Sequence, residues 1–325
     1  MRPEPQLKYL VPRTAYRDLW AGISNVLTHL EAHWRGLNVG RRTKYLLRST
    51  SVAVGVGILT SSCASFPARP AEQSLRVMSY NIRSGNGNLD STAAAIRAQA
   101  PDIVALQEVD VHWADRSAFV DQVAVLAAKL GMEARFAPIY VLPGLTPGAA
   151  SREFGVALLS RYHIVRFRND TIARLSTQVQ NPVPEPSPGL LDVLLDVDGH
   201  PVRVFNTHLD YRKDPAVRMR QVREMLGYIG DVSVPTIVFG DMNAAPDAPE
   251  LQPLLGRLHD AWSGHPDPGF TYPAEAPRER IDYVLVSPQF IVRNVKVPDT
   301  QASDHRPVVA ELVLRTDSAI SARAP

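Results

Sequence analysis

The feature that most constrains the fold is a series of short apolar runs between residues 75 and 314. Eight of these runs are typical of strands, and three further segments have the apolar spacing of amphipathic helices. The Asp198-Gly199 pair joins two runs in the manner of a tight hairpin, which is not a regular strand–helix alternation. The pattern therefore predicts one layered α+β domain over residues 75–315. The expected strands are 75–82, 102–106, 155–160, 190–197, 202–208, 236–239, 281–286 and 307–314, and the expected helices are 91–99, 119–130 and 215–229.

Charge separates this domain from the N-terminal part of the 325-residue chain. Residues 1–48 contain nine Lys or Arg and three Asp or Glu, a net charge of +6, whereas residues 49–325 contain 26 and 30, a net charge of −4. The overall charge of +2 therefore does not indicate a basic, nucleic-acid-binding body. The single cysteine excludes a disulfide framework and a zinc site made of thiolates.

The segment 41–66 is similar to a secretory signal peptide. Basic residues at 41, 42, 44 and 48 precede an uncharged apolar run and then a stretch of small residues. The run is too short to span a bilayer, so we expect export, with the protein either secreted or held on the outer side of the cytoplasmic membrane. Cys63 is either a lipid attachment point or an inert cysteine of the leader. Residues 1–40 are either an amphipathic, membrane-associated extension or, as we favour, the result of a start codon placed too early. Residues 316–325 are expected to be a disordered tail.

Polar side chains follow the predicted strands at the points where the strands end. Because strands packed in a sandwich expose their ends together, these clusters indicate one shared rim. Converging carboxylates without basic neighbours repel one another unless a cation lies between them. Oxygen ligands favour Mg²⁺ or Mn²⁺ over zinc, and nearby imidazoles suit phosphoryl transfer, so the rim predicts a metal-dependent hydrolase. The rim residues are Asn81, Gln107, Glu108, Asn206, His208, Asp241, Asn243, Asp282, Asp304 and His305.

An ordered set of short motifs carries a family resemblance over about residues 75–314. The set resembles the endonuclease/exonuclease/phosphatase superfamily, and it implies a deoxyribonuclease I-like fold, a four-layer α/β/β/α sandwich of two mixed sheets flanked by helices. The motifs are Ser79-Tyr80-Asn81-Ile82-Arg83, Leu106-Gln107-Glu108-Val109-Asp110, Gly155-Val156-Ala157-Leu158-Leu159-Ser160, Asn206-Thr207-His208-Leu209, Gly240-Asp241-Met242-Asn243, Arg280-Ile281-Asp282-Tyr283 and Ser303-Asp304-His305.

The resemblance also implies roles at the metal. Glu108 corresponds to the principal Mg²⁺ carboxylate, Asn81 to an amide that helps to place the metal, and Asp304 to a further acid at the metal. Asp241 corresponds to the residue that orients or deprotonates the attacking water. The implied reaction is a single in-line attack of water on phosphorus, without a covalent intermediate.

Further residues correspond to phosphate contacts and supports. Asn243 would hold a phosphate oxygen, and His208 and His305 would face the phosphate, with Asp282 fixing the orientation of His305. Gln107 and Asn206 are expected to brace the site by hydrogen bonds.

The sequence leaves three hypotheses about the function open. We favour a phosphoesterase acting on a lipid head group or another small phosphoester, over a secreted nuclease and over a non-catalytic binding protein. Some DNA-cleaving relatives have an acid where this chain has Arg83, which either contacts substrate phosphate or forms a surface ion pair. Arg212 is a further possible substrate contact, in a local basic patch that would suit nucleic acid.

Lipid substrates would require an exposed apolar loop, for which residues 140–145 are a candidate, with a buried hairpin edge as the alternative. The leader or Cys63 could add a membrane contact, and we expect a monomer. The Pro-rich segment 178–189 is expected to be an irregular surface loop.

Overall fold

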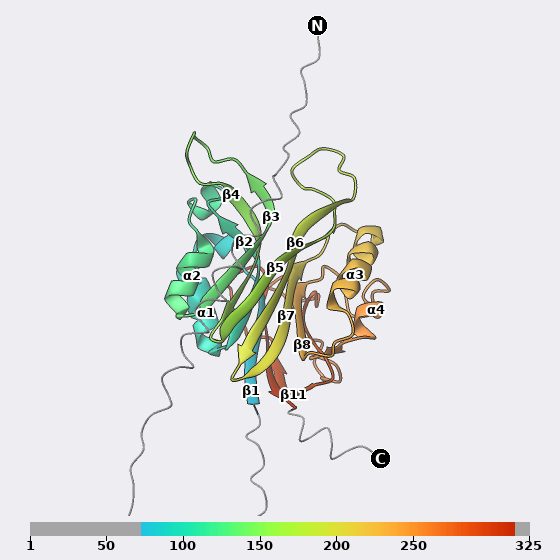
Figure 1. The fold of residues 1–325 in the computed structure, drawn as a ribbon. Coiled ribbons are helices and arrows are strands. Elements are labelled where there is room, and N and C mark those ends of the chain that lie inside the picture. The colour runs from blue at the N-terminus through green and yellow to red at the C-terminus, as the bar shows by residue number, and fades with distance from the viewer. Residues whose placement is uncertain (1–72, 316–325) are drawn as a thin grey trace, which may run out of the picture. The chain divides into compact units, whose positions relative to one another are not determined.

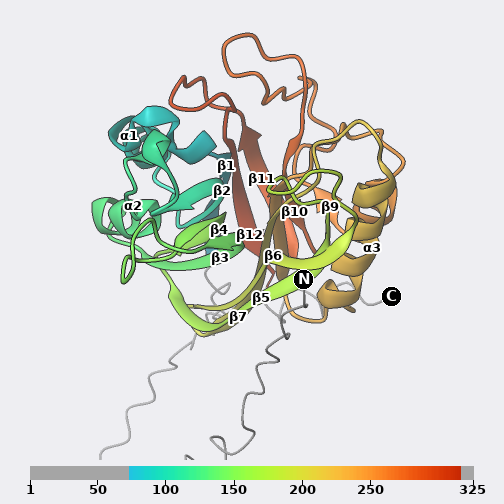
Figure 2. The same ribbon diagram turned by 90° about the horizontal axis from the view of Figure 1, so that it is seen from above.

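The computed structural model describes residues 73–315, and these residues form two six-stranded sheets that pack face to face (Figures 1 and 2). The predicted extension 1–40, the leader 41–66 with Cys63 and the tail 316–325 lie outside the described residues. Within 73–315, no helix is long and apolar enough to cross a membrane. One sheet has the order β11 (Phe290–Lys296), β12 (Val308–Leu314), β1 (Gln73–Asn81), β2 (Ile103–Val111), β4 (Arg152–Ser160) and β3 (Glu133–Leu142); the other has the order β5 (His163–Arg174), β6 (Glu185–Val197), β7 (His200–His208), β8 (Thr236–Asp241), β10 (Asp282–Val286) and β9 (His259–Asp260).

Helices cover the outer face of each sheet and complete the four layers (Figure 2). The central strands are buried on both faces, which explains their nearly continuous apolar sequences. In β1, for example, Val77 belongs to the core between the sheets, whereas Met78 packs in the cluster that contains the helix residue Ile96. The predicted α/β/β/α sandwich is thereby confirmed. The helices are α1 (Leu89–Gln99), α2 (Gln122–Leu130), α3 (Ala216–Ile229) and α4 (Gln252–Leu255), with short 3₁₀ turns η1 (Arg83–Gly87) and η2 (Asp115–Ser117).

The Pro-rich segment 178–189 is not irregular throughout, as the sequence had suggested, because β6 already begins at Glu185. Residues 185–187 pair only with β5, and pairing with β7 starts at Leu191. Proline has no backbone N–H to donate, and it is tolerated here because this part of β6 has a neighbouring strand on one side only. The buried Arg174 guanidinium also donates hydrogen bonds to the carbonyls of Pro188 and Gly189 at 2.9 Å each. An arginine from β5 thus fastens this segment in an extended conformation. The sequence also did not predict β3, β5, β9 and β11.

The strand pairing brings the polar strand ends to one edge of the sandwich. In the first sheet, β1 and β2 are parallel and Asn81 pairs in register with Gln107. In the second sheet, β7 and β8 are parallel with His208 opposite Asp241, and the antiparallel β10 places Asp282 opposite Asp241 on its other side. The predicted hairpin at Asp198-Gly199 is confirmed, with Val197 paired to His200.

Candidate active site

Glu108 reaches the site through an irregularity in β2. The pairing of β2 with β4 shifts register between Leu106 and Val109, and Glu108 has a φ of +54°. This left-handed conformation is uncommon for a residue with a side chain, and such outliers cluster at functional sites. The bulge sets the Glu108 carboxylate beside Asn81, whose Nδ2 lies 3.0 Å from Glu108 Oε1.

Asn81 connects carboxylates from both sheets. Its Nδ2 donates to Glu108 Oε1 and to Asp241 Oδ2, at 3.0 Å each, while its Oδ1 accepts from the backbone N–H of Arg83. Asn81 and Asp241 are both almost fully buried. Glu108 from one sheet and Asp241 from the other therefore converge on a single amide group.

Two histidines face the same carboxylate oxygen of Asp241. His208 Nε2 lies 3.5 Å and His305 Nε2 lies 3.8 Å from Asp241 Oδ2. The other ring nitrogen of His305, Nδ1, is 2.9 Å from Asp282 Oδ2, and the ring of Tyr272 packs against His305 with 4.8 Å between centroids. The carboxylate and the aromatic ring together fix the orientation of the imidazole, and Tyr272 is a contact for which the sequence held no motif.

The charges around His305 favour its protonated form. Burial by itself would lower the pKa of His305, but attraction to Asp282, the hydrogen bond to it, and the nearby charges of Asp241 and Asp304 raise that pKa to about 10. Burial raises the pKa of the Asp282 carboxyl, and the facing imidazolium opposes this shift. In the metal-free protein, His305 is therefore a cation at neutral pH and can attract a phosphate.

The remaining predicted residues fall into three groups. Asn243, with a φ of +48°, donates its N–H to Asp241 Oδ1 at 3.0 Å and its Nδ2 to the carbonyl of Leu209 at 3.0 Å. Gln107 Nε2 donates to Asn206 Oδ1 at 2.7 Å. Asn206 Nδ2 in turn donates to two carbonyls of the opposite sheet at 2.9 Å, those of Leu106 and Ala157. This buried network joins the two sheets directly behind the site.

The third group consists of Asp304, Arg83 and Arg212, which form ion pairs at the rim. The Asp304 carboxylate lies 3.4 Å from Arg83 Nε and 3.3 Å from the Ser303 hydroxyl. Arg212 forms an ion pair with Asp210 at 2.5 Å. Both arginines thus already have acidic partners, although the Arg83 side chain remains 57% exposed.

The donor groups fit a hard divalent cation. The Glu108 carboxylate faces that of Asp241 across the Asn81 amide, whose Nδ2 donates to both. One ligand atom each of Asp241, Asp282 and His305 also lie within 4.8 Å of one another, although His305 and Asp282 already share a hydrogen bond. Carboxylate and amide oxygens are the ligands that Mg²⁺ and Mn²⁺ prefer.

A family model described as the Endonuclease/Exonuclease/phosphatase family matches residues 78–305. The chain belongs to this family. Its enzymes hydrolyse phosphoester bonds and generally depend on divalent metals, so the predicted superfamily and the hydrolase class are confirmed. The matched range begins in β1 and ends at His305, and it therefore includes every predicted rim residue.

Solved structures agree with this assignment. An endonuclease/exonuclease/phosphatase from Beutenbergia cavernae is 28% identical, with a TM-score of 0.61 and coverage of 75% of this chain and 72% of its own. A mannosyl-6-phosphatase from Bacteroides thetaiotaomicron is 20% identical (TM-score 0.58, coverage 74% and 100%). The human Nocturnin catalytic domain with bound sulfate is also 20% identical (TM-score 0.57, coverage 74% and 95%). No curated protein matched the chain.

Proposed function

We propose that this protein is a Mg²⁺-dependent phosphoesterase that hydrolyses a lipid head group or another small phosphoester. The observation that carries the proposal is the convergence on Asp241 of one amide and two imidazoles, beside the carboxylate of Glu108. Such an arrangement suits a water nucleophile at Asp241 and a phosphate held between positive groups.

Each of the site residues has a role in the proposed reaction. Asp241 orients the attacking water and accepts its proton, and His208 and His305 bind the non-bridging phosphate oxygens. Asp282 keeps the Nε2 edge of His305 directed toward the phosphate through its 2.9 Å contact with Nδ1. Asn243 offers the amide hydrogen that is not used by Leu209. Glu108, with Asn81 and Asp304, would hold the metal, which when bound neutralises charge on the phosphate.

The test is hydrolysis by the purified full chain, with and without Mg²⁺, of bis-p-nitrophenyl phosphate, sphingomyelin, phosphoinositides and plasmid DNA. We expect metal-dependent turnover of a small or lipid phosphoester, and a loss of at least about 100-fold in kcat for Glu108→Gln. Glu311→Gln is the matched control, because Glu311 on β12 forms an ion pair with Arg76 on β1 and is not a rim residue. Turnover that survives EDTA, or an active Glu108→Gln variant, would contradict the mechanism, and preferred cleavage of plasmid DNA would make the protein a nuclease.

A further inference from the structure

Two uncharged segments lie at the active-site end of the sandwich, and one of them lines a small cavity. Residues 141–151 (segment A) comprise the last two residues of β3 and the connection to β4, and residues 175–184 (segment B) connect β5 to β6; both project beyond the same end of the sheets (Figure 1). Together they contain 21 residues and no Asp, Glu, Lys or Arg, although 21% of the chain is charged and about four charges would be expected. Solvent-exposed loops are rarely free of charge over such a length.

Large apolar side chains are exposed on both segments. Val141 and Leu145 of segment A and Val179 and Val183 of segment B are each between 56% and 63% exposed. Tyr211, which lines the cavity, is 62% exposed. These five are the majority of the eight large hydrophobic residues exposed within residues 73–315, and grouped exposure of this kind marks an interaction surface.

The segments are held in place by hydrogen bonds. The Thr177 N–H of segment B donates to the hydroxyl of Tyr140, which directly precedes segment A, at 3.0 Å. Arg152 donates to the Pro143 carbonyl at 2.9 Å, and Arg212 donates to the Leu175 carbonyl at 3.3 Å. Segment B is thus fastened to Tyr140 and Arg212 of the cavity wall, and segment A is fastened to Arg152 at the start of β4.

Leu175 and Thr177 of segment B line the cavity, and so does Tyr140, the residue that precedes segment A. The cavity has a volume of about 200 Å³, and its lining also includes Glu108, His208, Phe154 and Tyr211. Sites for whole drug-sized ligands usually measure about 300–1,000 Å³, so this cavity can hold the polar group of a phosphoester but not long acyl chains. The chains of a lipid substrate would have to remain outside its mouth.

We propose that segments A and B dock on a lipid layer, so that a phosphoester head group enters the cavity while its acyl chains stay in the layer. This inference rests on the proposed function and assigns its substrate to a lipid surface. Because the segments carry no charge, apolar insertion drives the docking, and zwitterionic lipid is sufficient.

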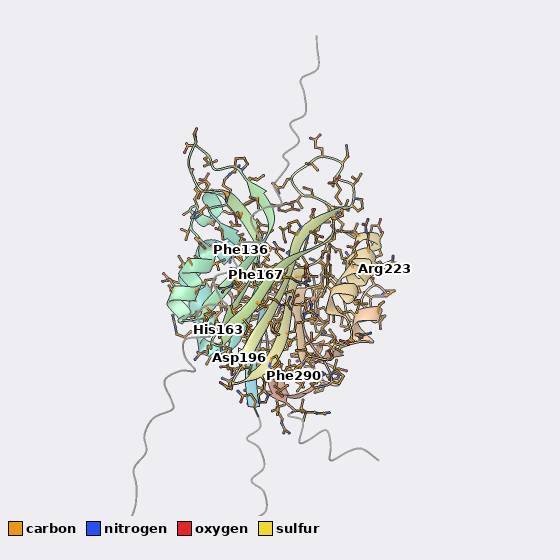
Figure 3. All side chains as sticks on the ribbon, in the orientation of Figure 1. Phe136, His163, Phe167, Asp196, Arg223 and Phe290 are labelled. Atoms are coloured by element: carbon orange, nitrogen blue, oxygen red, sulfur yellow. The ribbon has the colours of Figure 1, made fainter. Side chains whose placement is uncertain are left out.

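The test is flotation of the full chain with phosphatidylcholine vesicles. The variant Leu145→Ser/Val183→Ser removes one apolar side chain from each segment, and we expect its partition coefficient to fall at least about tenfold, with little dependence on salt. The control Val165→Ser/Met219→Ser removes two other exposed apolar side chains and should float like the wild type. Figure 3 labels His163 and Phe167, which lie on either side of Val165 in sequence, on the body of β5 away from the two segments.

A soluble substrate separates this inference from the proposed function. Hydrolysis of bis-p-nitrophenyl phosphate should be the same in the segment variant and the wild type, whereas hydrolysis of lipid in vesicles should fall. Failure of the wild type to hydrolyse any phosphoester would overturn the proposed function alone. The docking inference is overturned if both double variants bind vesicles equally, if binding requires anionic lipid and disappears at high salt, or if the segment variant instead loses self-association measured by sedimentation.

Discussion

Replacing Asp282 with Asn should destabilise the metal-free protein in a way that depends on pH. Asp282 is buried and lies 2.9 Å from His305 Nδ1. The rise in the pKa of His305 from 6.5 to about 10 corresponds to a preference of about 5 kcal/mol for the imidazolium, shared among Asp282, Asp241 and Asp304. Breaking a buried ion pair by removing one partner costs about 3–5 kcal/mol. We therefore expect Asp282→Asn to lower the free energy of unfolding by about 3 kcal/mol at pH 6.

The sign of the pH dependence follows from the raised pKa. A group whose pKa is higher in the folded state contributes stability that is complete below its unfolded value, near 6.5, and that is lost as the pH rises through about 10. The difference between wild type and Asp282→Asn should therefore shrink to less than about half by pH 10. Urea unfolding of EDTA-treated protein, followed by tryptophan fluorescence at pH 6 and pH 10, measures both values.

A second buried carboxylate provides the control. Asp192 Oδ2 lies 2.9 Å from Arg203 Nη2, and an arginine does not titrate in this range, so Asp192→Asn should cost the same at both pH values. Equal destabilisation by Asp282→Asn at pH 6 and pH 10, or a loss at pH 6 below about 1 kcal/mol, would refute the view that Asp282 stabilises an imidazolium.

Two further predictions concern the packing of the sandwich. Asn206→Ala should lower the free energy of unfolding by about 3 kcal/mol, because it removes the side-chain donor to the Leu106 and Ala157 carbonyls, and it should lower kcat by disturbing Glu108. Asn294→Ala is the control, because Asn294 is an exposed residue of β11, and equal urea midpoints for the two variants would contradict the prediction. Gly155→Ala should cost at least about 2 kcal/mol, because a Cβ there would lie 2.2 Å from the Ala137 carbonyl oxygen. Gly227→Ala in α3 meets no atom within 4 Å and should stabilise the protein by about 0.5–1 kcal/mol, so thermal melting of the two glycine variants should move in opposite directions.

Local sequence patterns were sufficient for the elements whose signals lie within a few residues. The run 202–208 became β7 and the helical spacing at 215–229 became α3, since apolar periodicity records which faces of an element are buried. The order of the motifs also identified the family. The sequence pattern did not predict β5, because polar and charged residues interrupt the apolar alternation of that strand. The missed strand includes Arg174.

The geometry of the site was decided by tertiary structure. Asn81 and Asp241 are 160 residues apart, and their 3.0 Å contact exists only because two separate sheets pack together. The conformation of Glu108 depends on a bulge in the pairing of β2 with β4. The ring contact between Tyr272 and His305 joins two residues that are far apart in the sequence. The exposed surface of segments A and B likewise depends on two loops reaching the same end of the sandwich. The sequence by itself thus determined which chemical groups are present and on which elements they lie, because those signals are local. The distances between the groups were set by packing between residues far apart in the chain.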